Sequence, residues 1–437
     1  MRYILGTALL ILSFAAPAQA VKVEEIKTDK GLTAWLVRDT TNPIISIRFS
    51  FKGGSALDPT GKEGLAELVA STLDEGAGKW DSRVFQRQME DLSVQLRFDA
   101  GRDSFGGRLK TLRKNRMAAF NLLRAAVTKP RFDEEPVARI RGQLLAGLRQ
   151  EAEDPGSVAG KTLMKTLFPK HPYGRPGSGT IESIAAITQE DLNNFVKRRL
   201  ARNNLVVGIV GDISMKEAAA FLSETFGALP ETATPWTLPD VVAAAAGKTI
   251  IVEKPVPQSS IMYAHEGIKR DDPDFFTAFL LNHILGGGSF TSRLYQNIRE
   301  KRGLVYSISS YLHSMDWAAL IAGSGGTANA RVGETVTLLR KEFNRIAKDG
   351  ITKTELSEAK TFQTGSFTLR FTSSGRIAGM LVWMQLWNRG IDYFDRRNAL
   401  IEAVTLKDAN RVAKKFLNGD KLTVVVVGQP KGLKASQ

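Results

Sequence analysis

The sequence predicts an α+β protein built from two similar halves, in which helices pack on mostly antiparallel sheets. The first observation is an internal repeat, because residues 187–212 align without gaps with residues 404–429. The second is an irregular alternation of strand-like and helix-like segments in each half, with paired helices in the middle. The third is the length of 437 residues, which is more than a single domain with one hydrophobic core ordinarily contains.

Residues 1–20 have the three-part pattern of a secretory signal peptide. Arg2 gives a positive start, residues 4–14 form an apolar run, and Ala18-Gln19-Ala20 is a small-x-small cleavage site. The apolar run is too short to span a membrane, so we expect cleavage after Ala20 rather than an anchor. The chain has no cysteine, and an exported protein without disulfides suits a bacterial periplasm. We therefore expect a periplasmic protein.

The formal net charge is +15, and the basic residues are spread along the chain rather than gathered in one tract. Such a charge keeps a protein soluble, and it also attracts an acidic partner or an acidic peptide. Nucleic-acid binding is the third interpretation, and the predicted export argues against it. We expect a solubilising surface first and a surface for an acidic partner second.

The two halves begin alike. Residues 44–51 are typical of an apolar strand, Asp58-Pro59 indicates a turn, and an apolar helix follows from Gly64. In the second half, strand 259–265 is followed by a turn at Asp272-Pro273 and a helix over residues 275–285. We expect halves at residues 21–229 and 248–437, joined by an extended linker at 230–247 that contains two prolines.

Within the first half, a long helix is expected from the acidic run 133–135 to Glu153, with Asp133 as its N-cap. Each copy of the repeat then predicts one helix followed by an apolar strand that stops at a glycine. Thr188 and Thr405 occupy the same position in the two copies, and each is placed to cap its helix.

The first helix, residues 64–73, reads GLAELVASTL. It resembles the N-terminal signature of the pitrilysin/insulinase family of zinc metallopeptidases, whose members carry the inverted zinc motif H-x-x-E-H here. On that motif the first ligand becomes Glu67, the catalytic glutamate becomes Ala70 and the second ligand becomes Ser71. A zinc peptidase needs two imidazoles one helical turn apart and a carboxylate to activate water. Of the three degenerate positions, Glu67 alone has a side chain that can ligate zinc.

The family's third ligand is a glutamate in the helix that ends at Glu153, and its position falls on Ala146 and Gly147. Neither residue has a side chain that can bind metal. The four histidines of the chain, at 171, 265, 283 and 313, are all more than one helical turn apart in sequence. His171 belongs to HPYGRPGSGT, which resembles a structural loop of the family. We expect no metal site and no cofactor on this chain.

The second half keeps a different motif of the family. Residues 286–308 read GGGSFTSRLYQNIREKRGLVYSI, which resembles a glycine-rich loop followed by SRL-x-x-x-[IV]REK-x-GL-x-Y. The resemblance implies that Arg299 and Tyr306 hold a peptide beside the zinc of another half or subunit. It also implies two halves of two α/β modules each, closed like a clam-shell. Gly287 and Gly288 are expected to let an extended peptide approach the backbone.

Three functions remain open at this point. The leading one is a non-catalytic, substrate-holding subunit of a periplasmic heterodimeric zinc peptidase, whose homologous partner carries H-x-x-E-H and the zinc. The chain alone is then expected to have no activity, and its substrates are peptides. The second is a peptide-binding or scaffold protein without an enzymatic partner. The third is an active zinc peptidase with an unusual metal site.

Overall fold

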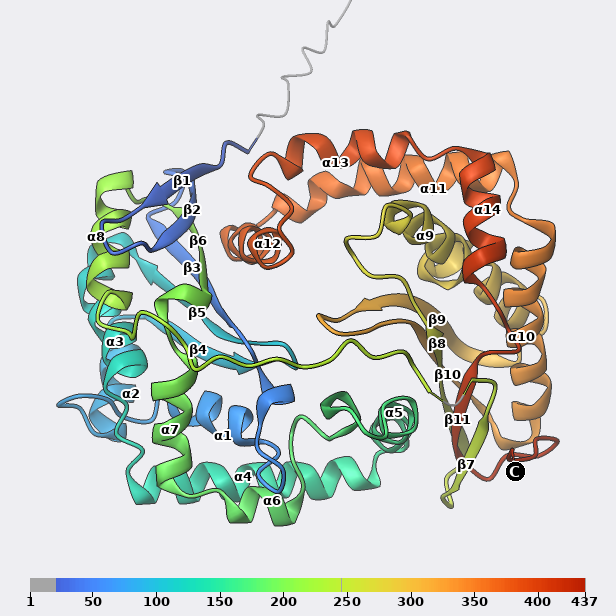
Figure 1. Ribbon diagram of the computed structural model, residues 1–437, viewed down its shortest axis with the longest axis horizontal. Coiled ribbons are helices and arrows are strands. Elements are labelled where there is room, and N and C mark those ends of the chain that lie inside the picture. The colour runs from blue at the N-terminus through green and yellow to red at the C-terminus, as the bar shows by residue number, and fades with distance from the viewer. Residues whose placement is uncertain (1–20, 245, 437) are drawn as a thin grey trace, which may run out of the picture.

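The computed structural model describes residues 21–244 and 246–436 of the chain. Within these residues the strands form two sheets, one in each half, and helices pack on both (Figure 1). This is the predicted α+β fold of two similar halves. The described part of each half has a single sheet, where the resemblance implies two modules per half. The predicted signal peptide lies outside the described residues.

The first sheet has the strand order β1-β2-β6-β3-β5-β4 and the second has the order β7-β11-β8-β10-β9. The strands of the first sheet are β1 (Glu24–Lys27), β2 (Thr33–Arg38), β3 (Ile44–Lys52), β4 (Gln95–Ala100), β5 (Ser104–Leu112) and β6 (Leu205–Gly211). The strands of the second sheet are β7 (Thr249–Glu253), β8 (Gln258–Glu266), β9 (Val305–Ser314), β10 (Ala319–Ala328) and β11 (Thr423–Gly428).

Helices precede, connect and follow these strands. In the first half they are α1 (Leu65–Thr72), α2 (Ser82–Asp91), α3 (Arg116–Thr128), α4 (Glu134–Glu153), α5 (Pro155–Leu167), α6 (Ile181–Ala186), α7 (Gln189–Arg199) and α8 (Met215–Phe226). In the second half they are α9 (Phe275–Asn282), α10 (Val332–Asp349), α11 (Lys353–Gly365), α12 (Ser374–Leu386), α13 (Tyr393–Glu402) and α14 (Leu406–Phe416).

The sheet topology confirms the internal repeat. In the first sheet β6 is parallel to β2 and antiparallel to β3, and in the second β11 is parallel to β7 and antiparallel to β8. The helices before the repeated strands, α7 and α14, begin at Thr188 and Thr405. Each threonine side chain accepts a hydrogen bond from the backbone N–H of an aspartate three residues later. Both predicted N-caps are therefore confirmed.

Asp133 is the N-cap residue of α4, as predicted, although its carboxylate accepts a hydrogen bond from Arg131 Nε at 2.6 Å and makes no side-chain capping bond. One local prediction is corrected. The helix expected over residues 275–285 is α-helical only to Asn282 and continues as a π-helical turn, His283–Gly287. A glycine-rich end to a helix favours such a widened turn because glycine adopts irregular backbone conformations freely.

Each sheet is covered on one face by a helix from the other half. Helix α5, from the first half, packs on β8 and β11, where Leu163 and Leu167 join a buried cluster with Val425 and Val427. Helix α12, from the second half, packs on β3 and β6. Figure 1 shows α12 beside the first sheet and α5 beside the second. In this exchange of helices, each half buries apolar surface of the other, and this burial stabilises the contact between the two halves.

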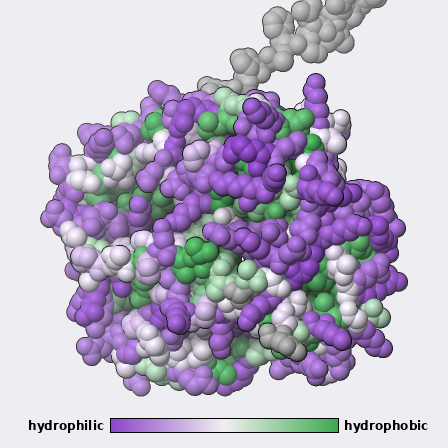
Figure 2. Space-filling view, turned by 45° about the vertical axis from the view of Figure 1, so that its right-hand side comes forward, coloured by the Kyte–Doolittle hydropathy of each residue, from purple (hydrophilic) through white to green (hydrophobic). Residues whose placement is uncertain are grey.

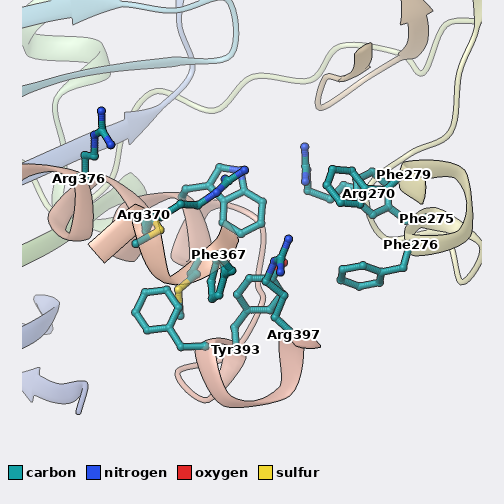
Figure 3. A pocket seen from close by; sticks show the side chains of 14 residues that line it. Arg270, Phe275, Phe276, Phe279, Phe367, Arg370, Arg376, Tyr393 and Arg397 are labelled. Carbon is teal, nitrogen blue, oxygen red and sulfur yellow. The ribbon is translucent and has the colours of Figure 1, made fainter. Parts of the chain in front are cut away.

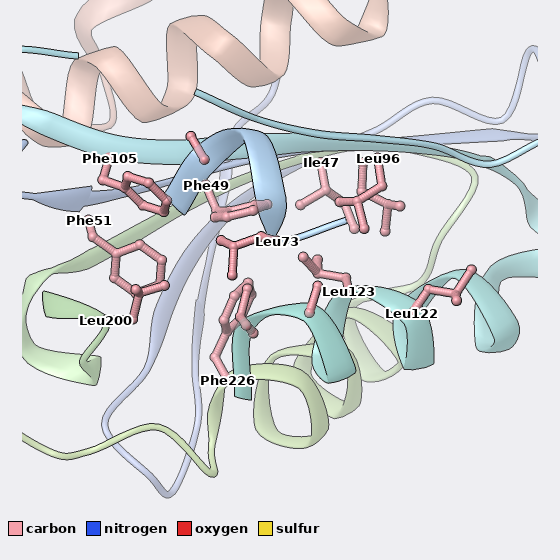
Figure 4. Packing of buried hydrophobic residues seen from close by; sticks show 14 of the residues in the cluster. Ile47, Phe49, Phe51, Leu73, Leu96, Phe105, Leu122, Leu123, Leu200 and Phe226 are labelled. Atoms are coloured by element: carbon pink, nitrogen blue, oxygen red, sulfur yellow. The ribbon is translucent and has the colours of Figure 1, made fainter. Parts of the chain in front are cut away.

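The other face of the first sheet forms the largest core of the first half. Aromatic rings of Phe49, Phe51 and Phe105 point from the strands toward side chains such as Leu123 of α3 and Phe226 of α8 (Figure 4). Because strand side chains alternate between faces, one sheet can present these rings to α3 and α8 and a second apolar set to α12.

Residues 230–244, 246 and 247, which belong to the predicted linker, contain no helix or strand. Backbone hydrogen bonds hold this stretch, from the Val241 N–H to the Trp317 carbonyl and from the Ala244 N–H to the Leu167 carbonyl, each 2.8 Å. The molecular face in Figure 2 is mainly hydrophilic, with small hydrophobic patches. In the described part of the chain, every helix is too short or too polar to cross a membrane.

Candidate functional site

Helix α1 begins where the zinc motif of the resembled family begins. Gly64 precedes the helix with φ of 90°, a left-handed conformation that suits glycine. The buried carboxylate of Asp58 accepts hydrogen bonds from the N–H groups of Gly64 and Ala66, at 3.0 and 3.2 Å. Burial nevertheless raises the pKa of Asp58 to about 7. The turn at Asp58-Pro59 therefore fixes the start of α1, as the sequence order suggested.

The three degenerate positions on α1 do not form a metal site. Ala70 is 4% exposed and belongs to the core of the first half, and Ser71 is half-buried. Burial raises the pKa of Glu67, and the nearby negative charges of Asp99 and Glu151 raise it further. No group of three or more His, Asp or Glu side chains in residues 21–244 and 246–436 is arranged to hold a metal ion.

The two residues at the position of the family's third ligand are exposed to solvent. Ala146 and Gly147 are exposed on α4, and a Cβ added at Gly147 would meet no atom within 4 Å. The nearest acids are engaged elsewhere, because Glu151 pairs with Lys161 at 2.6 Å and Glu153 pairs with Lys254 at 2.7 Å. The residues present do not fit a zinc ion, since one carboxylate, that of Glu67, remains where three ligands are required.

The histidines have structural surroundings. His171 Nδ1 accepts a hydrogen bond from the Tyr173 N–H at 3.2 Å, which agrees with the predicted structural role of that loop. His265 is buried, and burial lowers its pKa to about 4. His283 contacts Gln363 through Nδ1 at 3.1 Å and stacks on Phe362. Burial also lowers the pKa of His313.

The structure brings Arg299 and Tyr306 together. Arg299 lies in a π-helical segment, Tyr295–Glu300, and Tyr306 lies at the start of β9. The Arg299 Nε donates to the Tyr306 carbonyl oxygen at 2.9 Å, and the Tyr306 side chain is 82% exposed. The contact is made by the Tyr306 backbone. A guanidinium and an exposed phenol are two kinds of donor to a carbonyl or carboxylate group.

Two aromatic residues of this site were missed in the sequence. The Tyr295 hydroxyl accepts a hydrogen bond from Arg299 Nη1, and the Arg299 guanidinium lies 4.7 Å from the centre of the Tyr295 ring. Phe290 is 68% exposed, and its ring lies 4.9 Å from that of Tyr295. Glu300 also accepts from Arg299 Nη1, at 2.8 Å. The spacing of four residues between Tyr295 and Arg299 was the available signal, since such pairs meet on one helix face.

The glycine-rich loop has a packing reason of its own. A Cβ at Gly286 would lie 2.6 Å from Ser310 Oγ, one at Gly287 would lie 2.8 Å from Asn282 Nδ2, and one at Gly288 would lie 2.8 Å from the His283 carbonyl oxygen. The loop therefore packs against its own helix and β9. Gly287 is exposed, and contact of Gly287 and Gly288 with a peptide stays a prediction.

Arg293 has a structural role in holding this segment. Its Nε and Nη2 donate to the two carboxylate oxygens of Glu355 on α11, at 2.6 and 2.8 Å, and Nη2 also reaches the Gly350 carbonyl oxygen at 3.1 Å. A two-point arginine–carboxylate pair fixes direction as well as distance. The segment that carries Arg299 is thus held to α11.

Comparisons with known proteins place the chain among peptidase relatives. Residues 34–181 match the insulinase family (peptidase family M16), and residues 186–362 match the peptidase M16 inactive domain. A Helicobacter pylori protein called non-peptidase homolog YmxG is 27% identical over 435 residues, covering 99% of each chain. The uncharacterized zinc protease SCO5738 of Streptomyces coelicolor is 28% identical, covering 70% of this chain and 68% of its own.

A solved structure gives the same result. The crystal structure of a peptidase M16 inactive domain from Pseudomonas fluorescens is 31% identical and superposes with a TM-score of 0.88. The match covers 95% of this chain and 100% of that one. The similarity therefore extends over both sheets and the exchanged helices, rather than over one motif.

Proposed function

This chain belongs to the peptidase M16 family as an inactive member, and we propose that it is the substrate-holding subunit of a heterodimeric zinc peptidase. Its partner is a homologous subunit that carries H-x-x-E-H and the zinc ion. The substrates are peptides, and the chain alone has no peptidase activity. The observation that carries the proposal is the contrast between α1, which lacks a ligand set within the described residues, and the pair formed by half-buried Arg299 and exposed Tyr306.

In the complex, Arg299 and Tyr306 act on a peptide bound across the two subunits. Peptide cleavage places negative charge on the carbonyl oxygen, and a guanidinium and a phenol are donors that orient this oxygen and stabilise the charge. Contacts with the Tyr306 carbonyl, Tyr295 and Glu300 hold the guanidinium in one direction before a peptide arrives. Preorganised donors are effective because they need no rearrangement during the reaction.

The proposed compartment is the periplasm. The motivating observation is the signal-peptide pattern of residues 1–20, with cleavage after Ala20. The net charge of +15 supports a partner surface or a peptide of acidic character. Detection of the native protein in the periplasmic fraction, at the mass expected after cleavage, tests this part. An uncleaved chain in the cytoplasmic fraction would contradict it.

The central experiment compares the purified chain, an H-x-x-E-H homologue encoded beside it, and their mixture on a fluorogenic peptide. We expect cleavage by the mixture and none by the chain alone. Arg299→Ala should lower kcat/KM of the mixture by about 100-fold, the scale for loss of one donor to a developing oxyanion. Tyr306→Phe should also lower it, because the phenol donor is removed while the ring remains.

Lys301→Ala is the matched control. Lys301 is an exposed basic residue two positions from Arg299, so its loss changes the charge of the same segment equally. It should leave kcat/KM unchanged. Activity of the chain alone, or full activity of the mixture with Arg299→Ala, would refute the proposal. Peptide binding without any gain from a zinc-bearing homologue would instead support a peptide-binding or scaffold protein.

A further inference from the structure

A cavity of about 460 Å³ lies in the second half, between α9, α12 and α13. Its volume is in the range of small-molecule sites, about 300–1,000 Å³. Neither the degenerate zinc positions nor Arg299 and Tyr306 line it. The cavity is therefore separate from these positions.

Aromatic rings and methionine side chains form most of the cavity wall. Figure 3 shows Phe367 and Tyr393 on one side and Phe276 and Phe279 of α9 on the other. Trp383, Met380 and Met384 extend the wall along α12. Such a surface favours the apolar part of a ligand, because removing apolar groups from water is favourable. Flexible methionine side chains also adapt to the shape of the ligand.

Four arginines also line the cavity, and its lining contains no Asp or Glu. The Arg397 side chain is buried, and its guanidinium lies 4.2 Å from the centre of the Phe367 ring. Arg270 lies between rings of both walls, 4.7 Å from Phe275 and 4.9 Å from Trp383, and its Nε is buried without a hydrogen-bond partner. Figure 3 places both guanidinium groups between the two walls.

Buried positive charge without a carboxylate partner is costly. Burial, together with the charge of neighbouring Arg389, lowers the pKa of Arg270 to about 10. Burial likewise lowers the pKa of Arg397. Arg370 and Arg376 are exposed at the same cavity. Within the described residues none of the four cavity arginines pairs with a carboxylate, although many other arginines of the chain do. An anion would relieve this cost by supplying the missing partner.

We propose that this cavity binds a small amphiphilic anion, with a carboxylate or phosphate headgroup at the arginines and an apolar body between the aromatic walls. A fatty acid and a monoalkyl phosphate share this chemistry. An inorganic anion alone lacks the apolar part, and a cationic or neutral amphiphile lacks the charge that the arginines complement.

Calorimetric titration of the purified protein separates the contribution of the charged headgroup from that of the apolar body. The probes are dodecanoate, dodecyl phosphate, dodecyltrimethylammonium and inorganic phosphate, each below its micelle concentration. We expect one or both anionic amphiphiles to bind at least tenfold more tightly than the cation of the same chain length. Inorganic phosphate should bind at least tenfold more weakly than either amphiphile that binds. The better of the two anions identifies the headgroup.

Gly379→Leu tests the location. Gly379 lines the cavity on α12, and a Cβ there would meet no atom within 4 Å, so the leucine side chain has room to enter the cavity. Leucine also favours the helix over glycine. Gly375→Leu is the matched control, because Gly375 lies on the same helix with equal room and does not line the cavity.

We expect Gly379→Leu to weaken binding of the anionic amphiphile at least tenfold and Gly375→Leu to leave it within twofold. Arg370→Gln should reduce the preference for anion over cation without unfolding the protein, because Arg370 is exposed. Equal affinity for the anionic and cationic amphiphiles, or equal affinity of both glycine variants, would overturn the proposal. A preference for inorganic phosphate would also overturn it.

Discussion

Leu381 gives a sharp test of the exchange of helices between the halves. It lies on α12, in the second half of the chain, but it is 0% exposed against Trp35, Val37 and Val210 of the first sheet. Leu381→Ala removes three carbon atoms, which at about 0.8 kcal/mol each amounts to about 2.4 kcal/mol of lost transfer energy. The cavity left behind brings the expected cost to about 2–5 kcal/mol.

Native-state hydrogen exchange read by mass spectrometry locates this cost. In Leu381→Ala, peptides that cover β2 and β6 should exchange about 30- to 4,000-fold faster, because every 1.4 kcal/mol is a factor of ten. Leu280→Ala is the control, since Leu280 is equally buried but lies in the core of the second half. It should accelerate exchange in β8 and β10 first.

The reasoning would be refuted if Leu381→Ala changed exchange only within residues 353–402 and left β2 and β6 as protected as in the parent protein. That result would mean that α12 does not stabilise the sheet on which it packs.

Further predictions concern acid stability and metal binding. Burial raises the pKa of Glu355, but its hydrogen bonds with Arg293 and Thr352 outweigh this and bring the pKa to about 2. The folded pKa is below the ordinary value of 4.5, so this stabilisation is full above pH 4.5 and is lost as the pH falls toward 2. Denaturant titrations should therefore show a flatter pH dependence in this window for Glu355→Gln; an unchanged slope would count against the ion pair. Separately, the combination Glu67→His, Ser71→His and Gly147→Glu should retain stoichiometric zinc after gel filtration, measured by elemental analysis, because it restores two imidazoles one turn apart and a carboxylate at an open position. Gly147→Glu alone should retain none, and a folded but zinc-free triple variant would show that α1 and α4 are not positioned for the metal.

The repeated parts of the fold were predictable because their signals are local. Threonine caps such as Thr188 act within one helical turn, and an apolar strand that ends at glycine is visible in a short window. Asp133 is the N-cap residue of α4, as predicted, but its carboxylate pairs with Arg131, and a capping pattern does not predict that choice of partner. The exchange of α5 and α12 was not predicted, since an apolar helix face does not specify which sheet it meets.

The site was predicted in part for the same reason. Arg299 and Tyr306 belong to one long motif, and the structure places them in contact through the Tyr306 carbonyl. The cavity arginines could not be found in this way. Arg270 and Arg397 are separated by more than a hundred positions in the sequence, and only the packing of α9 against α12 and α13 brings them to one space. Lone arginines among aromatic residues carry no spacing signal.

The exchanged helices also set an order of events during synthesis. When the ribosome has completed the strands of the first sheet, at Gly211, the helix that covers Trp35 and Val210 is still more than a hundred and fifty residues away. One apolar face of that sheet therefore has no covering helix until synthesis of α12 ends at Leu386. A chain of this design gains from remaining unfolded until α12 has been synthesised. It also makes the first half, expressed alone, a poor candidate for a soluble domain.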